Sequence, residues 1–409
     1  MAFNKVLQQI NSSPTLALND KAQALLAQGR DLIHLGIGQP LNDFPPLAYE
    51  YALAALDSRQ VKYGPTSGSA ALKREIQRYT EKFYGRTPGL EQLIVTLGAK
   101  QSLANTLLVL LNAGDEVILL APYWVSYPEM IRLAGGHPVT VPPEQDLTPT
   151  LKAITAAVTP RTKAVILNSP NNPSGVVYPP ELIAAVVDYC EKEGIYLIMD
   201  DIYHQLVFHD QEWVPGYVFT SQPINDSHLI VINGISKSYG MTGFRVGWTV
   251  APSPLIQAMN TIQGHTTSGN SILLQQAALG AMESGQEPVE ELKDFILTNQ
   301  QILLQELAQI PGVRTIQPGG AFYCFPDFSR YEKDSRILAD FLLEKAFVLT
   351  VPGSAFGMEG HLRMSYTCPT DQVAESVRRI RWALDPTAPQ TITIGGQEVT
   401  CSWERSPSA

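Results

Sequence analysis

Two short apolar runs, Ala164-Val-Ile-Leu167 and Ile195-Tyr-Leu-Ile-Met199, decide the fold together with the helical pattern at about 180–193 that separates them. Continuous Val/Ile/Leu runs of this length are typical of strands that are buried on both faces of a sheet. Because a helix lies between them, the two strands are expected to run parallel, as in α/β proteins. The stretch therefore predicts a mainly parallel sheet that is covered by helices.

The same alternation continues on both sides of this unit. Strands are expected at 93–96, 116–120 and 138–141, and His228-Leu-Ile-Val-Ile-Asn233 is a further buried run. Helical patterns near 99–111, 125–134 and 149–157 separate the earlier strands. The fold class predicted from this order is α/β.

The ends of the chain have a different pattern. An arm, a helix at about 20–28 and a short strand at 32–35 come first, followed by helical patterns at 46–58 and 68–84. After residue 252, three helical segments lead into mixed strands and helices that end near residue 384. We therefore expect a large domain over 46–290, a smaller α+β domain from 1–45 and 291–385, and a C-terminal extension over 386–409. Within the extension, 391–403 fits either a hairpin about Gly395-Gly396 or a disordered tail.

Composition excludes several classes of protein. The chain has 409 residues and a net charge of −10, which argues against binding to nucleic acid or to an anionic membrane surface. Its four cysteines, at positions 190, 324, 368 and 401, form no CxxC pair and no cluster with histidine, so neither a disulfide framework nor a metal site is expected. The N-terminus has no signal-peptide pattern and no apolar run is long enough to span a membrane. A cytoplasmic location is the expectation.

Polar residues follow the strands at the edge where parallel sheets place their active sites. Asp200-Asp-Ile-Tyr203 follows one strand, Asn168-Ser-Pro-Asn-Asn172 another, and Ala121-Pro-Tyr-Trp124 a third. Gly98-Ala-Lys100 opens a helix, whose exposed backbone N–H groups can bind an anion. Asn233-Gly-Ile-Ser-Lys-Ser-Tyr-Gly-Met-Thr-Gly-Phe-Arg245 brings one lysine, Lys237, and one arginine to the same edge. A lysine, a carboxylate, an aromatic plate and an anion site suit pyridoxal 5′-phosphate.

Several motifs in order and at matching spacing resemble one family. They are Gly38-Gln-Pro40, Lys62-Tyr63, Pro122-Tyr-Trp124, Asn171-Asn-Pro-Ser-Gly175, Asp200-x-x-Tyr203, Ser236-Lys237 with Arg245, and Leu362-Arg-Met-Ser-Tyr366. From about Ser13 to Leu384 the chain resembles the class I, fold-type I pyridoxal-phosphate aminotransferases, and within them the bacterial aspartate aminotransferases. The resemblance implies a transferase with a seven-stranded, mainly parallel sheet in the large domain.

The resemblance also implies a role for each matched residue at the cofactor ring. Lys237 would form the imine with the cofactor and then move the proton from the substrate Cα. Asp200 would keep the pyridine nitrogen protonated. Tyr203 and Asn172 would donate hydrogen bonds to the phenolic oxygen, and Trp124 would stack on the ring.

The phosphate is implied to lie against Arg245, Ser236 and the backbone of Gly98 and Ala99, and Lys100 follows directly in that loop. The family pattern makes Tyr63 contact the phosphate in the neighbouring subunit, which implies a homodimer with shared active sites.

For the substrate, the resemblance assigns Arg363 to the α-carboxylate, helped by Asn172 and the backbone of Gly38. Thr15, in Ser13-Pro-Thr15, and Lys100 stand where the family binds a distal carboxylate. Aspartate or glutamate, with a 2-oxo acid as acceptor, is therefore the expected substrate. Asn11-Ser12 replaces a lysine found in prephenate-using members, and Leu41-Asn-Asp43 departs from the usual Asp-Phe near the substrate mouth.

Other functions on this fold stay open at this point. An aminotransferase for aromatic or other neutral amino acids, or a carbon–sulfur lyase, would use the same Lys237, Asp200 and Arg363. A cofactor-binding transcriptional regulator would need a DNA-binding extension and basic charge, and it is disfavoured because the family resemblance begins by about residue 13 and the net charge is −10.

Overall fold

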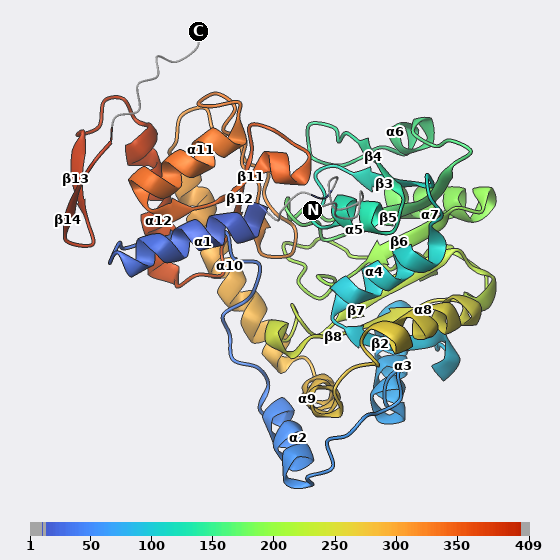
Figure 1. The fold of residues 1–409 in the computed structure, drawn as a ribbon. Coiled ribbons are helices and arrows are strands. Elements are labelled where there is room, and N and C mark those ends of the chain that lie inside the picture. Colours follow the sequence, from blue (N-terminus) through green and yellow to red (C-terminus); the bar gives the residue numbers. More distant parts are fainter. Residues whose placement is uncertain (1–9, 11–13, 402–409) are drawn as a thin grey trace, which may run out of the picture.

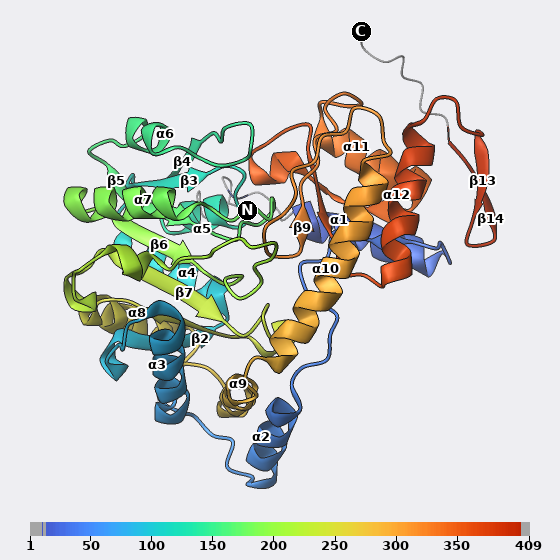
Figure 2. The same ribbon diagram turned by 180° about the vertical axis from the view of Figure 1, so that it is seen from behind.

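The computed structural model describes residue 10 and residues 14–401, and of residues 14–17 only the backbone. Figures 1 and 2 show two units side by side: a large unit built on a central sheet, and a smaller unit that contains both α1 and α12. No helix in the described part of the chain has both the length and the apolar character to cross a membrane.

The central sheet has seven strands in the order β2-β8-β7-β6-β5-β3-β4. All neighbouring pairs are parallel except the two that involve β8, which runs antiparallel to β2 and β7. The expectation of a seven-stranded, mainly parallel sheet is confirmed. The strands are β2 (Leu93–Leu97), β3 (Glu116–Leu120), β4 (His137–Val141), β5 (Thr162–Leu167), β6 (Tyr196–Asp200), β7 (Leu229–Gly234) and β8 (Val246–Val250).

Side chains alternate between the two faces of this sheet, and both faces are apolar. Ile166 and Ile198 contribute to the core on one face, while Val165 and Leu197 contribute to the core on the other. Covering helices bury both sets, which is why the strands are continuous apolar runs rather than alternating ones. The helices of this unit are α3 (Ala70–Tyr84), α4 (Ala99–Leu110), α5 (Tyr127–Leu133), α6 (Leu151–Ala156), α7 (Pro180–Glu193) and α8 (Ser253–Thr266).

Strand β8 was not expected from the sequence. Its run Val246-Gly-Trp-Thr-Val250 contains a glycine where a Cβ would lie 2.4 Å from the backbone nitrogen of Ala99. Gly247 therefore allows β8 to lie against the start of α4, at the cost of a weaker strand pattern. Because β7 and β8 are antiparallel neighbours, residues 235–245 connect them in a short loop at the C-terminal end of β7.

The smaller unit combines residues from both ends of the chain. Strand β1 pairs in parallel with β10, and β12 lies between β11 and β9. Strands β10 and β11 follow each other closely along the chain and pair with different partners. The elements are α1 (Pro14–Ala27), β1 (Ile33–His34), β9 (Tyr323–Cys324), α11 (Ser335–Phe341), β10 (Val348–Leu349), β11 (Val351–Pro352), β12 (Leu362–Ser365) and α12 (Thr370–Leu384).

Three further features complete the chain. The long helix α10 (Glu287–Leu307) leaves the region of α9 (Ile272–Glu283) and runs into the smaller unit beside α12. Helix α2 (Pro46–Asp57) packs on α9 at the bottom of the molecule as drawn in Figure 1. The tail forms a hairpin of β13 (Thr391–Ile394) and β14 (Gln397–Thr400) at the outer edge of the smaller unit, so the hairpin alternative is correct.

Candidate active site

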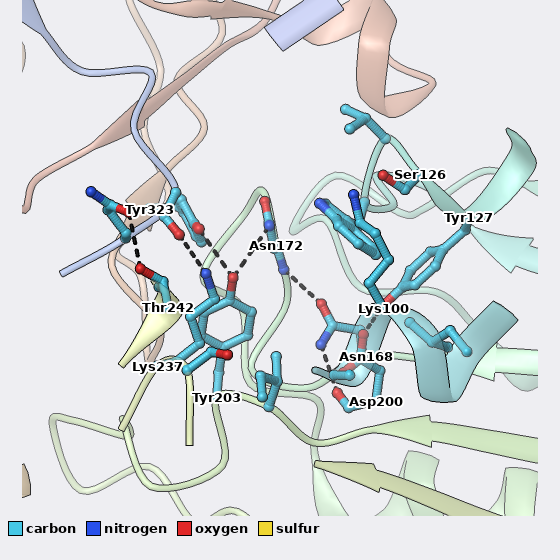
Figure 3. Close-up of a pocket in the computed structure, with 18 of the residues that line it drawn as sticks. Lys100, Ser126, Tyr127, Asn168, Asn172, Asp200, Tyr203, Lys237, Thr242 and Tyr323 are labelled. Carbon is cyan, nitrogen blue, oxygen red and sulfur yellow. Dashed lines mark hydrogen bonds between the residues drawn. The ribbon is translucent and has the colours of Figure 1, made fainter. Parts of the chain in front are cut away.

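A cavity of about 720 Å³ lies where β5, β6 and β7 end, and residues of the smaller unit also line it. Of the residues singled out in the sequence, those that line it are Gly38, Ala99, Lys100, Trp124, Asn172, Asp200, Tyr203, Ser236, Lys237, Arg245 and Arg363. Figure 3 shows the asparagines Asn168 and Asn172 between Lys237 on one side and Tyr127 on the other.

Lys237 lies three residues beyond the end of β7, and its Nζ donates a hydrogen bond to the carbonyl oxygen of Gly38. Burial, together with the positive charges of Arg363 and Arg245, lowers the pKa of Lys237 to about 7. A large part of the amine is therefore neutral near neutral pH, as a nucleophile or a base must be.

Asp200 is the last residue of β6 and is buried. Its Oδ2 accepts a hydrogen bond of 2.6 Å from the hydroxyl of Tyr127, while Oδ1 has no side-chain partner among the described residues. Burial raises the pKa of Asp200 to about 6, although Tyr127 opposes the rise. A buried carboxylate with an open oxygen is costly, so it favours a cationic partner from a ligand in the cavity.

The N-terminus of α4 lies beside Arg245. Gly98 precedes the helix with φ of 77°, and a Cβ at this position would lie 2.6 Å from Nη2 of Arg245. The arginine is held by its own bond to the carbonyl oxygen of Thr242, at 2.9 Å. Free helix N–H groups and a guanidinium at one place suit a phosphate. Gly98 does not line the cavity, but its small size leaves room for the arginine that does.

Arg363 comes from β12 in the smaller unit and is buried at 3% exposure. Its Nη1 donates to Oδ1 of Asn172 at 3.2 Å, and its Nη2 donates to the carbonyl oxygen of Gly36 at 2.8 Å. The Nε–H has no hydrogen-bond partner in the described part of the chain, so the guanidinium keeps a free donor. Burial lowers the pKa of Arg363, but the guanidinium stays a cation because its ordinary pKa is far above neutral pH.

Aromatic side chains define the walls of the cavity. The hydroxyl of Tyr203 lies 3.4 Å from Nδ2 of Asn172 and 3.0 Å from the hydroxyl of Tyr323. Burial raises the pKa of Tyr203 well above its usual value, so its hydroxyl keeps its proton and can donate it. On the opposite side, Nζ of Lys100 lies 4.9 Å from the centre of the Trp124 ring. Burial, and then the charge of Arg245, lower the pKa of Lys100.

Tyr63 is not brought to the cavity within this chain: it is 95% exposed, in the loop between α2 and α3, and does not line the cavity. Thr15 is the second residue of α1, and its side chain lies outside the described residues, as do Asn11, Ser12 and Ser13. Asn42, in the segment that departs from the family pattern, lies against Gly240 beside the Lys237 loop.

Sequence reasoning gave no role to four residues that shape the site: Gly36, Tyr127, Asn168 and Tyr323. Asn168 donates a bond of 2.7 Å to the carbonyl oxygen of Asp200, and its Oδ1 accepts from the backbone of Asn172 at 2.9 Å. Its place at the end of β5 was a usable signal. The sequence signal for Tyr127 was weaker: it stands three residues after Trp124, a spacing of about one helical turn.

Comparison with known proteins identifies the class. The model of the family "Aminotransferase class I and II" matches residues 30–380. The chain belongs to this family, and it is a pyridoxal-phosphate-dependent aminotransferase.

Particular relatives narrow the comparison. The chain is 39% identical to an aspartate aminotransferase of Geobacillus stearothermophilus, over 93% of this chain and 98% of that protein. It is 37% identical to a probable aspartate/prephenate aminotransferase of Aquifex aeolicus, over 93% and 98%. Among solved structures, an aspartate aminotransferase from Thermus thermophilus with maleate has a TM-score of 0.88 at 35% identity, covering 93% of this chain and 99% of that one.

The residues present fit pyridoxal 5′-phosphate. The unpaired oxygen of Asp200 suits a protonated pyridine nitrogen, and the cradle between Gly98 and Arg245 suits a phosphate. Lys237 supplies the amine and Trp124 an aromatic wall in the same cavity. The roles of the individual residues remain predictions.

Proposed function

We propose that this protein transfers the amino group of aspartate, or of glutamate, to a 2-oxo acid. The observation that carries the proposal is the charge of the cavity: Lys100, Arg245 and Arg363 line it, and Asp200 is the acidic residue in its lining. Three cations in one cavity favour ligands with several anionic groups. The cofactor phosphate and the two carboxylates of a dicarboxylic amino acid supply three such groups. The names of the relatives support the same substrate.

Each cation has a proposed partner. Arg245 binds the phosphate beside the start of α4, and Ser236 and the N–H groups near Gly98 and Ala99 add donors. Arg363 binds the α-carboxylate through a bidentate pair of hydrogen bonds. Lys100, with Thr15, binds the distal carboxylate.

When bound, pyridoxal 5′-phosphate supplies the ring that accepts electrons from the substrate Cα. Asp200 holds the positive charge at the ring nitrogen. The neutral amine of Lys237 takes the proton from the substrate Cα and delivers it to C4′ of the cofactor. Tyr203 and Asn172 donate hydrogen bonds to the phenolic oxygen, while Trp124 fixes the plane of the ring.

The proposal is tested by following cofactor absorbance while the protein is mixed with single amino acids. Aspartate and glutamate are expected to convert the cofactor to its amine form, and alanine and phenylalanine to do so more slowly. Lys100→Gln should lower kcat/KM for aspartate by about tenfold to a hundredfold, because one charge-assisted hydrogen bond is lost. The same change should leave kcat/KM for alanine within about twofold, since alanine has no distal carboxylate. Reaction with phenylalanine or cystathionine, and none with aspartate or glutamate, would exclude the proposed substrate.

We also propose a homodimer in which Tyr63 contacts the phosphate bound by the neighbouring subunit. Support comes from a row of exposed apolar side chains on and after α2: Tyr49, Leu53, Leu56 and Val61 are 57, 41, 52 and 42% exposed. Apolar side chains grouped in this way favour burial against a partner. Tyr63 follows this row directly and is itself almost fully exposed.

The proposal includes the domain limits and the location of the protein. A large domain over 46–290 and a small domain from 1–45 and 291–385 agree with the pairing of β1 and β10 across the two ends of the chain. A cytoplasmic location agrees with the free, buried thiols of Cys190, Cys324 and Cys368.

A further inference from the structure

Gly36 connects the smaller unit to the candidate carboxylate-binding arginine. Its carbonyl oxygen accepts a hydrogen bond from Nη2 of Arg363 at 2.8 Å, although the two residues are 327 positions apart. Its N–H donates to Nδ1 of His34, two residues earlier, at 3.1 Å. Both backbone groups of one glycine are thus engaged, one by the arginine and the other by a histidine.

The regular strand pairing ends just before Gly36. Leu35 donates its N–H to the carbonyl oxygen of Leu349 at 2.9 Å and accepts from the N–H of Ser365 at 2.6 Å. Beyond Leu35, the His34 ring holds the Gly36 N–H. A Cβ on Gly36 would lie 2.2 Å from Cδ2 of Leu349, so a larger residue at this position would displace that side chain.

We propose that His34 is a positioning residue for substrate binding: by accepting the N–H of Gly36, it holds the Gly36 carbonyl against Arg363 and so fixes the direction of the guanidinium. The inference rests on the proposed function, in which Arg363 binds the substrate α-carboxylate. The remaining surroundings of the guanidinium are the rings of Tyr323 and Phe356, whose centres lie 4.6 and 5.1 Å from Cζ. Stacked rings fix the plane of a guanidinium more firmly than its rotation within that plane, so the carbonyl of Gly36 and Oδ1 of Asn172 set the rotation.

The hydrogen bond determines the tautomer of His34. Because Nδ1 accepts from a backbone N–H, the ring proton is on Nε2, which lies 3.4 Å from Oδ1 of Asn19 in α1. A second proton would have to go to Nδ1, where it would face the Gly36 N–H as a donor facing a donor. Protonation of His34 therefore breaks the bond that holds Gly36.

The surroundings of His34 keep the ring neutral. Burial lowers the pKa of His34 below its usual value of 6.5, and the positive charge of Arg363 on β12 also lowers it, although a hydrogen bond to the backbone of His34 itself opposes the fall. The group facing it from α1 is the neutral Asn19, and the residue paired with it on β10 is the apolar Leu349. Because the pKa is lowered, the hydrogen bond is complete above pH 6.5 and is lost as the pH falls through the lowered value.

The experiment compares His34→Asn with His34→Leu in the holoenzyme. The Oδ1 of an asparagine takes the place of Nδ1 as an acceptor but does not titrate, whereas leucine has no acceptor. Maleate is the probe, and its Kd is measured from the cofactor absorbance. At about pH 8, His34→Asn should bind maleate within about twofold of wild type, and His34→Leu about tenfold more weakly. The KM for aspartate should follow the Kd, while kcat changes by less than about twofold.

The pH profile separates positioning from charge. As the pH falls toward about 5, wild type should lose affinity for maleate relative to His34→Asn, because only the histidine gives up its acceptor. If wild type instead binds more tightly than His34→Asn at low pH, the added positive charge dominates and the positioning role is wrong. It is also wrong if His34→Leu, with an unchanged cofactor spectrum, binds maleate as wild type does.

Arg363→Gln distinguishes failure of this inference from failure of the proposed function. If Arg363→Gln binds maleate as wild type does, the assignment of Arg363 to the carboxylate is wrong. If Arg363→Gln loses maleate while both His34 variants behave as wild type, Arg363 keeps its assignment and the role of His34 alone is rejected. A loss of folding in His34→Leu would appear as a lower Tm, and His34→Asn still tests the pH dependence.

Discussion

At the scale of single residues, burial sets the chemistry of the site. Lys237, Asp200 and Tyr203 each lose hydration in the cavity wall. In each case the pKa shifts in the direction that favours the neutral form of the side chain. Charges then adjust the result: Arg363 and Arg245 lower the pKa of Lys237 further, while Tyr127 limits the rise at Asp200. A neutral amine and a carboxylate with an open oxygen follow from these neighbours.

The first prediction concerns the pH dependence of cofactor binding to the apoprotein. Because the pKa of Lys237 is lowered to about 7, the rate of covalent attachment should rise as pH increases through 7 and level off above it. Arg363→Gln removes the largest of the charges that lower this pKa, so the midpoint should move to higher pH. Stopped-flow absorbance measures both, with Lys237→Ala as the control that forms no covalent complex. A rate that is independent of pH between about 6 and 9 would contradict the assignment of Lys237.

The second prediction concerns Asp201, which is fully buried beside Asp200. Burial and the charge of Asp200 raise its pKa well above the usual 3.8, and the hydroxyl of Tyr84 offsets this only in part. As the pH rises above 3.8, the unfolded chain releases this proton while the folded chain retains it, so stability is lost with rising pH.

Asp201→Asn cannot ionise and should therefore raise the Tm relative to wild type at about pH 8, with a smaller difference at about pH 4. Thermal unfolding at the two pH values measures the effect. A difference in Tm that is equal at both values would show that the proton of Asp201 is not the cause.

At the scale of elements, the β7–β8 connection and the start of α4 form one structure. Gly247 lets β8 approach Ala99, and Asn270 ties the backbone of Arg245 to that of Thr96 with bonds of 2.9 and 3.0 Å. The backbone at Arg245 is therefore also held from outside its own loop, through Asn270 and the end of β2. This explains how a glycine-rich segment can keep two reactive side chains in place.

The C-terminal hairpin gives the third prediction. Ile394 and Val399 are buried against Phe347 of the smaller unit, while Thr393 on the same strand is exposed. Ile394→Ala should lower the free energy of unfolding by about 2 kcal/mol, because buried methyl groups are lost. Thr393→Ala should change it by less than about 0.5 kcal/mol. Chemical denaturation measures both, and equal stabilities of the two variants would mean that the hairpin does not stabilise the smaller unit.

At the scale of the whole molecule, the cavity needs both units. Lys237 and Asp200 come from the large unit, whereas Gly38 and Arg363 come from the two chain segments that form the smaller one. The bond between Lys237 and the carbonyl of Gly38 crosses between them. Any change in the relative position of the two units would therefore change the distances between the residues that line the cavity.

The fourth prediction tests the shared site of the proposed homodimer. Tyr63→Phe should weaken retention of the cofactor, and Lys237→Ala should abolish its covalent attachment. In mixed dimers of the two variants, half of the sites would combine an intact Lys237 with an intact Tyr63 from the other subunit.

Those sites should regain wild-type retention of the cofactor, as followed by absorbance during dialysis. If Tyr63 acted within its own subunit, mixing would restore nothing. Sedimentation of the unmixed protein provides the control, because a monomer at micromolar concentration would reject the dimer itself.

The sequence alone indicated most of the elements, although not β8, and several of the reactive residues. Apolar runs such as Ala164–Leu167 can only be buried strands, and polar residues after them must gather at one edge of a parallel sheet. Lys237, Asp200 and Asn172 could therefore be identified from their positions after the strands, whereas Arg363 was identified from the motif resemblance. The motif resemblance added their expected roles.

Tertiary structure alone decided how these residues are held. Three contacts join positions that are far apart in the chain. They are the hydrogen bond from Tyr127 to Asp200, the hydrogen bond from Arg363 to the carbonyl oxygen of Gly36, and the packing of β8 against Ala99. Local periodicity contains no information about such contacts, because they depend on how packed elements meet rather than on neighbours in sequence. The pKa values of Lys237 and Asp200 also depend on burial and nearby charge, which exist only once the chain has folded.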